Sequence, residues 1–143
     1  MTHAKDKTVL SLMNIGSVVE KDFKEVHPEM KLRDMVQTIS ESNRNLFPVT
    51  DAEGNLKGIV LLDDIRNIMF RSDLYDKMTV SRFMAMPPAR IQLTDSMETV
   101  MKTFDKTNAW NLPVVDNEKY IGFVSKSKIF NSYREVLRNY SDD

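Results

Sequence analysis

An internal repeat constrains the fold of this chain more than any other feature of its sequence. Two segments match, FPVTDAEGNLKGIVLLDD at residues 47–64 and NLPVVDNEKYIGFVSKSK at residues 111–128. Pro48 and Pro113 lie 65 residues apart, whereas Gly58 and Gly122 lie 64 apart because the second turn is one residue shorter. A spacing of this size indicates two copies of one supersecondary unit, neither of which buries enough apolar surface alone.

A helical pattern precedes each Pro-Val motif. Apolar residues recur at i, i+3, i+4 and i+7 in both copies, as Leu32, Met35, Val36 and Ile39 and then as Met97, Val100, Met101 and Phe104. Asp95, with Glu98 three residues later, resembles a capping box at the start of the second helix. The sequence therefore predicts two amphipathic helices in the same register.

Two short apolar runs around an Asp-led turn predict a hairpin in each copy. A further helix is expected after each hairpin, through Ile65, Ile68 and Met69 in the first copy and from Ile129 to Leu137 in the second. Extended lead-in segments near residues 18–26 and 89–93 complete the units. The expected fold class is α+β, with two pseudo-twofold related β-α-β-β-α repeats packed sheet to sheet. The expected parts are a lead-in helix (1–17), the first repeat (18–72), a linker (73–88), the second repeat (89–140) and a tail (141–143).

Composition argues against several classes of protein. A formal net charge of −1 does not suit broad neutralisation of phosphates, so we expect no nucleic-acid partner. No apolar run approaches the roughly 18 residues that cross a bilayer, and residues 1–10 lack the apolar core of a signal peptide, so the chain as given is expected to be soluble. Without cysteine it can form no disulfide or thiolate metal site.

Catalysis is not expected either. His27 has no acid or nucleophile partner that the sequence reveals, and the adjacent Asp63 and Asp64 do not share a helix face. The four glycines form neither a P-loop nor a dinucleotide fingerprint. We therefore expect no enzyme, no required cofactor and no metal site.

The pattern apolar-Pro-Val-x-Asp, a turn, Gly-apolar-Val and a helix, given twice, resembles the tandem cystathionine-β-synthase domain, also called a CBS pair or Bateman module. The resemblance runs from about Val18 to Arg134. More narrowly, SNRNLFPVTD, LYDKMTVSRFMAMPP and NAWNLPVVDNEKYIGFVSKSKIFNSYR are similar to the cytoplasmic C-terminal region of bacterial voltage-gated chloride channels and chloride/proton antiporters. This resemblance implies a regulatory homodimer on the cytoplasmic side of the inner membrane, attached to the membrane transport domain of the same full-length protein. Because no membrane helices are present, we expect an excised domain or a free-standing relative.

The same resemblance implies ATP, ADP or AMP as a regulatory ligand in two clefts between the repeats. The implied contact positions are Arg44, Asn45 and Lys128 in one cleft, and Ala109, Trp110, Leu61 and Asp64 in the other. The usual ribose-binding pattern, Gly-apolar-x-[Ser/Thr]-x-x-Asp, is split between the copies. GIVLLDD keeps Asp64 but has Leu61 in the hydroxyl position, and GFVSKSK keeps Ser125 but has Lys128 instead of Asp. Lysine cannot accept hydrogen bonds from a ribose.

Each of these residues also has a structural interpretation. Ser125, Lys126 and Lys128 form either an anion site at a helix start or a Ser cap beside solvated lysines. Trp110 suits packing or an interface, Asp64 a helix cap, and Arg44 a surface residue that pairs with an acidic neighbour. Three functions therefore stay open: a nucleotide-regulated domain of a chloride transporter, a ligand-free module for transporter dimerisation, and a free-standing adenine-nucleotide sensor.

Overall fold

The two compact units of the fold do not follow the two sequence repeats. The computed structural model describes residues 8–142, with side chains up to Tyr140. Of these residues, unit 1 holds those up to Lys21, Pro88–Asn117 and those from Ile121 onward, whereas unit 2 holds Asp22–Pro87 and Glu118–Tyr120. Nowhere in this described part does a helix have the length and apolar content needed to cross a membrane.

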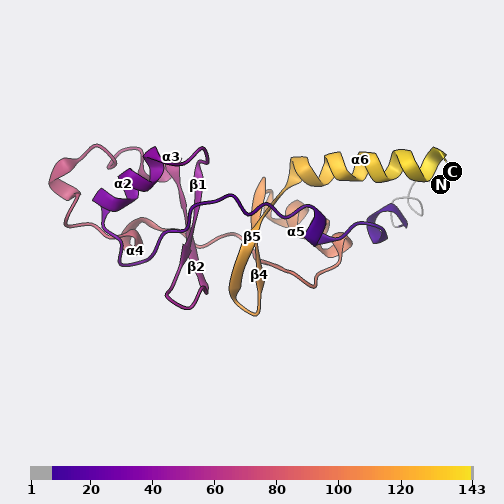
Figure 1. The fold of residues 1–143 in the computed structure, drawn as a ribbon, viewed down its shortest axis with the longest axis horizontal. Coiled ribbons are helices and arrows are strands. Elements are labelled where there is room, and N and C mark those ends of the chain that lie inside the picture. The colour runs from indigo at the N-terminus through magenta and orange to yellow at the C-terminus, as the bar shows by residue number, and fades with distance from the viewer. Residues whose placement is uncertain (1–7, 143) are drawn as a thin grey trace. The chain divides into compact units, whose positions relative to one another are not determined.

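Unit 2 is built around the predicted hairpin, formed by β1 (Leu46–Thr50) and β2 (Leu56–Leu61) (Figure 1). The two strands pair antiparallel, with a bulge where β1 reaches Thr50. Val26 forms a parallel bridge to β1, and Ala85 forms an antiparallel bridge to β2. Both edges of the short hairpin are therefore covered by other parts of the same unit, which removes open edges that invite aggregation.

The helices of unit 2 are short. They are α2 (Leu32–Ser40), α3 (Leu62–Ile65), the 3₁₀ turn η2 (Ser72–Leu74) and α4 (Val80–Phe83). The predicted helical face of α2 is confirmed, because Leu32 and Met35 are fully buried. The core of the unit joins this face to both strands through Met35, Phe47, Val49, Val60, Ile65 and Val80.

The helix predicted through Ile68 and Met69 is wrong, because α3 ends at Ile65 and the chain continues as turns. The chain has to return to the start of α2, where Tyr75 and Met78 offer their carbonyl oxygens to the N–H groups of Arg33 (3.1 Å) and Leu32 (2.8 Å). Those donors have no partner inside α2, since the first turn of any helix leaves its N–H groups unsatisfied. Residues 75–78 therefore pair with the first turn of α2, and they do not continue helix α3.

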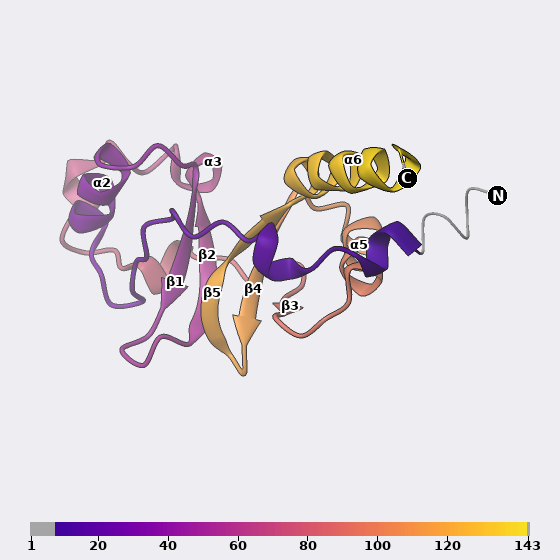
Figure 2. The same ribbon diagram turned by 45° about the vertical axis from the view of Figure 1, so that its right-hand side comes forward.

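Unit 1 contains the second repeat's sheet, with the strand order β3 (Ile91–Gln92), β4 (Asn111–Asp116) and β5 (Lys119–Ser125). Figure 2 shows this sheet with the two helices that pack on it, α5 (Met97–Thr107) and α6 (Lys126–Asp142). β3 runs parallel to β4. The predicted core face of α5 is confirmed, with Met97, Val100 and Phe104 buried.

The opening segment belongs to the core of unit 1. Residues 8–11 are helical and η1 (Ile15–Ser17) follows, while residues 1–7 of the predicted lead-in helix lie outside the described part. Val9, Met13, Ile15 and Val18 are buried. At the other end, α6 continues to Asp142, two residues into the predicted tail.

The capping box predicted on Asp95 is wrong by one residue. Ser96 caps α5, and its hydroxyl oxygen accepts the N–H of Thr99 at 3.1 Å. The Asp95 carboxylate instead accepts the N–H of Gln92 at 2.9 Å. The Asp95 side chain thus stabilises the turn after β3, and the Ser96 side chain caps the first turn of α5.

Each unit takes in a segment from the other sequence repeat. In unit 1, Glu20 pairs with Phe123 of β5 through two backbone hydrogen bonds of 2.8 and 2.9 Å. In unit 2, Glu118 and Tyr120 form backbone hydrogen bonds to Leu56 and Gly54, each of 2.9 Å. The predicted lead-in strand at residues 18–26 is therefore split, with Glu20 bound in unit 1 and Val26 in unit 2.

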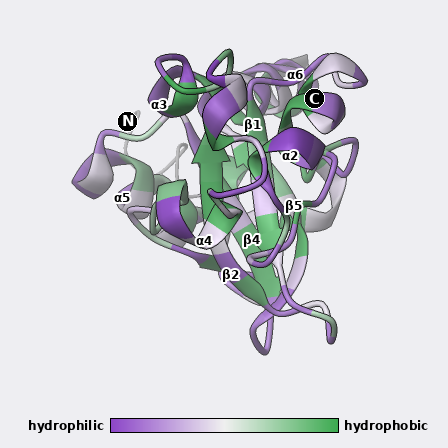
Figure 3. Ribbon diagram, turned by 90° about the vertical axis from the view of Figure 1, so that its left-hand side faces the viewer, coloured by the Kyte–Doolittle hydropathy of each residue, from purple (hydrophilic) through white to green (hydrophobic). Residues whose placement is uncertain are grey.

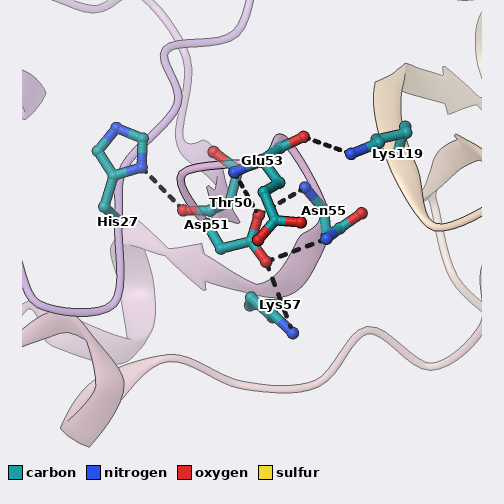
Figure 4. Close-up of polar contacts among 7 residues, drawn as sticks. All are labelled: His27, Thr50, Asp51, Glu53, Asn55, Lys57 and Lys119. Atoms are coloured by element: carbon teal, nitrogen blue, oxygen red, sulfur yellow. Dashed lines mark hydrogen bonds and ion pairs between the residues drawn. The ribbon is translucent and has the colours of Figure 1, made fainter.

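The first hairpin turn is organised by the carboxylate of Asp51 (Figure 4). It accepts the N–H groups of Glu53 and Asn55, each at 2.9 Å, and lies 3.7 Å from the ammonium group of Lys57. Lys119 donates to the carbonyl oxygen of Glu53 at 2.6 Å. The N–H of Asn55 contributes most to holding the pKa of the Asp51 carboxyl below its ordinary value.

This lowered pKa predicts an acid-sensitive turn. The Asp51 carboxyl binds protons less readily in the folded than in the unfolded chain, so its contribution to stability is complete above its unfolded pKa and is lost as the pH falls through its folded one. We expect Asp51→Asn to be less stable than wild type at pH 7, and this difference to shrink below about pH 4. Urea unfolding of both proteins at pH 7 and pH 3 measures it. If the stability difference between the two proteins is the same at pH 7 and pH 3, the charge of the Asp51 carboxylate does not stabilise the turn.

The predicted fold class is confirmed as a mixed α/β fold with two small sheets and helices. In Figure 3 hydrophobic residues gather in the strands and hydrophilic residues at the hairpin tips, while the helices carry both kinds. All five residues of β1 are buried, as are the four central residues of β4. Side chains on both faces of these strands are buried, which explains why their sequences are almost continuously apolar.

Candidate functional site

The same hydrogen bond joins the two ends of the hairpin in both repeats. The carbonyl oxygen of Asn45, just before β1, accepts the N–H of Leu62 at 2.9 Å. The carbonyl oxygen of Trp110, just before β4, accepts the N–H of Lys126, also at 2.9 Å. The predicted site residues thus form two groups at equivalent places. The first strand-end group, in unit 2, is Arg44, Asn45, Leu61 and Asp64, and the second, in unit 1, is Ala109, Trp110, Ser125 and Lys128.

Arg44 is held firmly within the first strand-end group. Its guanidinium forms an ion pair with Asp22 (Nη2 to Oδ1, 2.6 Å) and lies over the Phe23 ring at 4.3 Å from the centroid. Its interpretation as a residue that pairs with an acidic neighbour is therefore confirmed. Any anion that recruits Arg44 has to compete with the Asp22 carboxylate.

The phenol of Tyr120 adds to this environment in unit 2. Burial raises its pKa above the ordinary range, and the carboxylates of Glu25 and Asp22 raise it further, while Arg44 lowers it. The phenol is therefore neutral at physiological pH. Within unit 2 the Asp22 carboxylate thus offsets the positive charge of the Arg44 guanidinium.

The two acidic residues of α3 behave differently from one another. Asp63 pairs with Arg66, and Asp64 is exposed, with neither hydrogen bond nor ion pair to the part of the chain that the structure describes. The start of α3 has no side-chain cap, so the cap interpretation of Asp64 is wrong. Its carboxylate is a potential acceptor for a hydroxyl group from outside the unit.

The second strand-end group presents an exposed indole beside cations. Trp110 is 72% exposed, and the ammonium group of Lys126 lies 5.3 Å from its ring centroid. The hydroxyl of Ser125 accepts the N–H of Lys128 at 3.1 Å, so the predicted Ser cap is confirmed. Lys128 is exposed and Ala109 is half-buried. The packing interpretation of Trp110 is not supported within unit 1, because most of the ring faces solvent.

The sequence did not reveal the residues that hold Arg44. Asp22 and Phe23 lie more than twenty positions earlier, in a segment without clear periodicity. No sequence signal could have identified them, because they meet only through the fold. Over the residues described, no three His, Cys, Asp or Glu side chains gather in a way that could hold a metal ion.

Comparisons with known proteins agree with this architecture. The family model described as CBS domain matches residues 15–71 and again residues 80–135. Arabinose 5-phosphate isomerase KpsF of Escherichia coli is 27% identical over 77 residues, which cover 54% of this chain and 24% of that enzyme. The chain thus spans about a quarter of the length of this curated relative.

Two solved structures share the fold. CbpB in complex with c-di-AMP has a TM-score of 0.77 and 14% identity, and the match covers 97% of this chain and 96% of CbpB. The CBS domain of a bacterial CNNM/CorC family Mg²⁺ transporter has a TM-score of 0.74 and 14% identity, with 91% and 80% covered. At such identities the likeness establishes the fold alone.

Proposed function

Because the chain belongs to the CBS domain family, whose paired domains are generally regulatory and not catalytic, we propose that it senses an adenine nucleotide and passes the signal to an attached protein. The observation that carries this proposal is the recurrence of the strand-end group in both units. Each group offers exposed side chains able to bind a nucleotide, Asp64 in one and Trp110 and Lys128 in the other. A ligand that prefers one arrangement of the module would shift its population toward that arrangement.

The ligand contacts that we propose are the side chains of the two strand-end groups, each considered within its own unit. Unit 2 offers Arg44, Asn45 and Asp64, and unit 1 offers Ala109, Trp110, Ser125 and Lys128. The Trp110 indole supplies a face for a base, and the Asp64 carboxylate accepts from ribose hydroxyls. Lys128 suits a phosphate better than a ribose.

The ligand that we propose is ATP, ADP or AMP, or a dinucleotide of the kind bound by CbpB. The attached protein that we propose is the membrane transport domain of a chloride channel or antiporter, with two copies of the module pairing on the cytoplasmic side of the membrane. Two observations support this part: the sequence resemblance described above, and the shared fold with the CBS domain of a magnesium transporter. Purifying the module together with such a transport domain would test it.

A ligand-free dimerisation module is the second candidate. It is favoured because Arg44 is already engaged by Asp22 and Phe23, and because the Ser125 hydroxyl is engaged by the N–H of Lys128. A nucleotide would have to displace the Asp22 contact in order to use Arg44. This candidate predicts no response to any nucleotide.

Isothermal titration with ATP, ADP, AMP and c-di-AMP, with and without magnesium, distinguishes the two candidates. We expect binding that weakens about tenfold or more in Asp64→Ala, since a hydrogen bond to a charged group contributes about 1.5–3 kcal/mol. Asp63→Ala is the matched control, because that carboxylate is exposed and pairs with Arg66. Loss of binding on Lys128→Ala instead would assign the ligand contact to the second strand-end group. If no nucleotide gives a heat of binding at millimolar concentration, the dimerisation module is the candidate that remains.

A further inference from the structure

Helix α6 concentrates positive charge, although the formal net charge of the whole chain is −1. Its described side chains carry one acid, Glu135, and four cations, namely Lys126, Lys128, Arg134 and Arg138. Of these cations Lys128, Arg134 and Arg138 are exposed. An excess of one charge on an exposed helix surface attracts partners of the opposite charge.

None of these four cations pairs with a carboxylate among the side chains that the structure describes. Lys126 lies over the Trp110 ring, and Arg134 donates to the neutral amide oxygen of Asn131 at 2.9 Å. In unit 2, by contrast, exposed arginines pair with aspartates, as Arg33 with Asp76, Arg66 with Asp63 and Arg71 with Asp73. The positive charge of α6 is therefore available to an anion from outside the chain.

Two exposed aromatic rings accompany the cations. Lys126, Phe130, Arg134 and Arg138 follow one another at intervals of four residues, so each neighbours the next along the helix surface. Phe130 is 46% exposed, and Trp110, whose ring lies beside Lys126, is 72% exposed. We call Trp110, Lys126, Phe130, Arg134 and Arg138 the basic-aromatic row. The Phe130 ring thus lies between two cations on one surface of α6.

A membrane surface with anionic lipids is the partner that suits this combination of side chains. Lipid phosphates attract unpaired cations, and each Lys or Arg near an anionic bilayer strengthens binding about fivefold. Exposed aromatic rings gain burial at the boundary between headgroups and acyl chains, beside the cations that contact the phosphates. An inorganic phosphate would use the same cations but leave the Phe130 ring in water.

We propose that the basic-aromatic row of α6 binds the surface of an anionic membrane. The helix lies along the interface, with the aromatic rings among the headgroups and with Arg134 and Arg138 against the phosphates. The opposite face of α6, with Ile129 and Val136, stays packed in unit 1, so binding requires no unfolding. This inference goes beyond the proposed function, and it rests neither on nucleotide binding nor on a transport domain.

Flotation with lipid vesicles tests the role of the charges. We expect the protein to float with vesicles of equimolar phosphatidylcholine and phosphatidylglycerol, and to be released by high salt, which screens the attraction. Arg134→Gln combined with Arg138→Gln should weaken this binding about tenfold or more. Arg66→Gln combined with Arg71→Gln is the matched control, because it changes the net charge equally but removes arginines that are already paired. Equal losses in the two double variants, equal binding to pure phosphatidylcholine vesicles, or no flotation would overturn the proposal.

Fluorescence tests the role of the aromatic rings, since Trp110 is the single tryptophan of the chain. Adding the anionic vesicles should shift its emission to shorter wavelength as the indole leaves water. Phe130→Ala should weaken vesicle binding several-fold, because binding scales with the apolar area buried. An unchanged emission spectrum together with unchanged binding of Phe130→Ala would contradict the contact.

Two further arms separate a membrane from other anions. Inorganic phosphate should release the protein from vesicles no better than sodium chloride of the same ionic strength. Stronger release by phosphate would indicate a free-phosphate site, and tighter binding to duplex DNA than to vesicles a nucleic-acid surface, and either result would overturn the proposal. Nucleotide titration of the Arg134→Gln and Arg138→Gln double variant keeps this inference apart from the proposed function, because neither residue is a proposed ligand contact and the nucleotide should bind as to wild type.

Discussion

Gly122→Ala is expected to destabilise the protein by about 2–3 kcal/mol, because β5 leaves no room for a side chain at that position. A Cβ atom there would fall on the carbonyl oxygen of Glu20 and within 2.9 Å of Cγ2 of Val19. Both belong to the segment that pairs with β5, and its backbone cannot move away without breaking the hydrogen bonds between Glu20 and Phe123. Thermal unfolding should show a midpoint lowered by roughly 5 to 10 °C.

Gly16→Ala is the matched control for this substitution. The atom nearest to a Cβ at Gly16 is Oδ1 of Asn14, at 3.2 Å, which belongs to a side chain and not to the backbone. We expect a much smaller shift of the midpoint. A Gly122→Ala protein that melts like wild type would show that residues 19–20 leave β5 readily.

Phe104→Ala is expected to cost about 3–5 kcal/mol, because the ring is fully buried in the core of unit 1. We also expect the variant to unfold in one transition. β5 has Lys119 and Tyr120 in unit 2 and its remaining residues in unit 1, so neither unit can lose this strand alone. Urea unfolding followed by circular dichroism and by Trp110 fluorescence measures both expectations.

Phe130→Ala is the control, since that ring also lies on a helix of unit 1 but is 46% exposed. It should cost about 1 kcal/mol or less, because little area is removed from the core. Two separate transitions in Phe104→Ala, with unit 2 persisting after unit 1, would show that the shared strand does not couple the units.

The two repeat glycines illustrate what the sequence could and could not tell. The sequence showed that Gly58 and Gly122 are equivalent positions, but it did not show why glycine is required at them. In the structure another segment crosses each of them: the carbonyl oxygen of Ala85 lies 2.9 Å from a Cβ built at Gly58, and Glu20 occupies the same place at Gly122. Close approach of a second backbone requires glycine, and that approach depends on residues distant in the chain.

The candidate site divides in the same way. The sequence located Ser125 at the start of the last helix and the residues before each hairpin, because caps and strand ends follow local patterns. It left the partners of Arg44 unknown, and it extended the helix after the first hairpin too far. The Asp22–Arg44 pair and the return of residues 75–78 to α2 depend on contacts across the fold.

The sequence by itself determined the repeat, the hairpins and the buried faces of α2 and α5, since side-chain periodicity reports which face of a single element is covered. The tertiary structure alone decided the exchange of segments between the repeats, by which Glu20 joins β5 and Glu118 and Tyr120 join the first hairpin turn. The physical reason is that these pairings are made by backbone N–H and carbonyl groups. Every residue other than proline carries both groups, so such pairings leave no trace in the order of side chains.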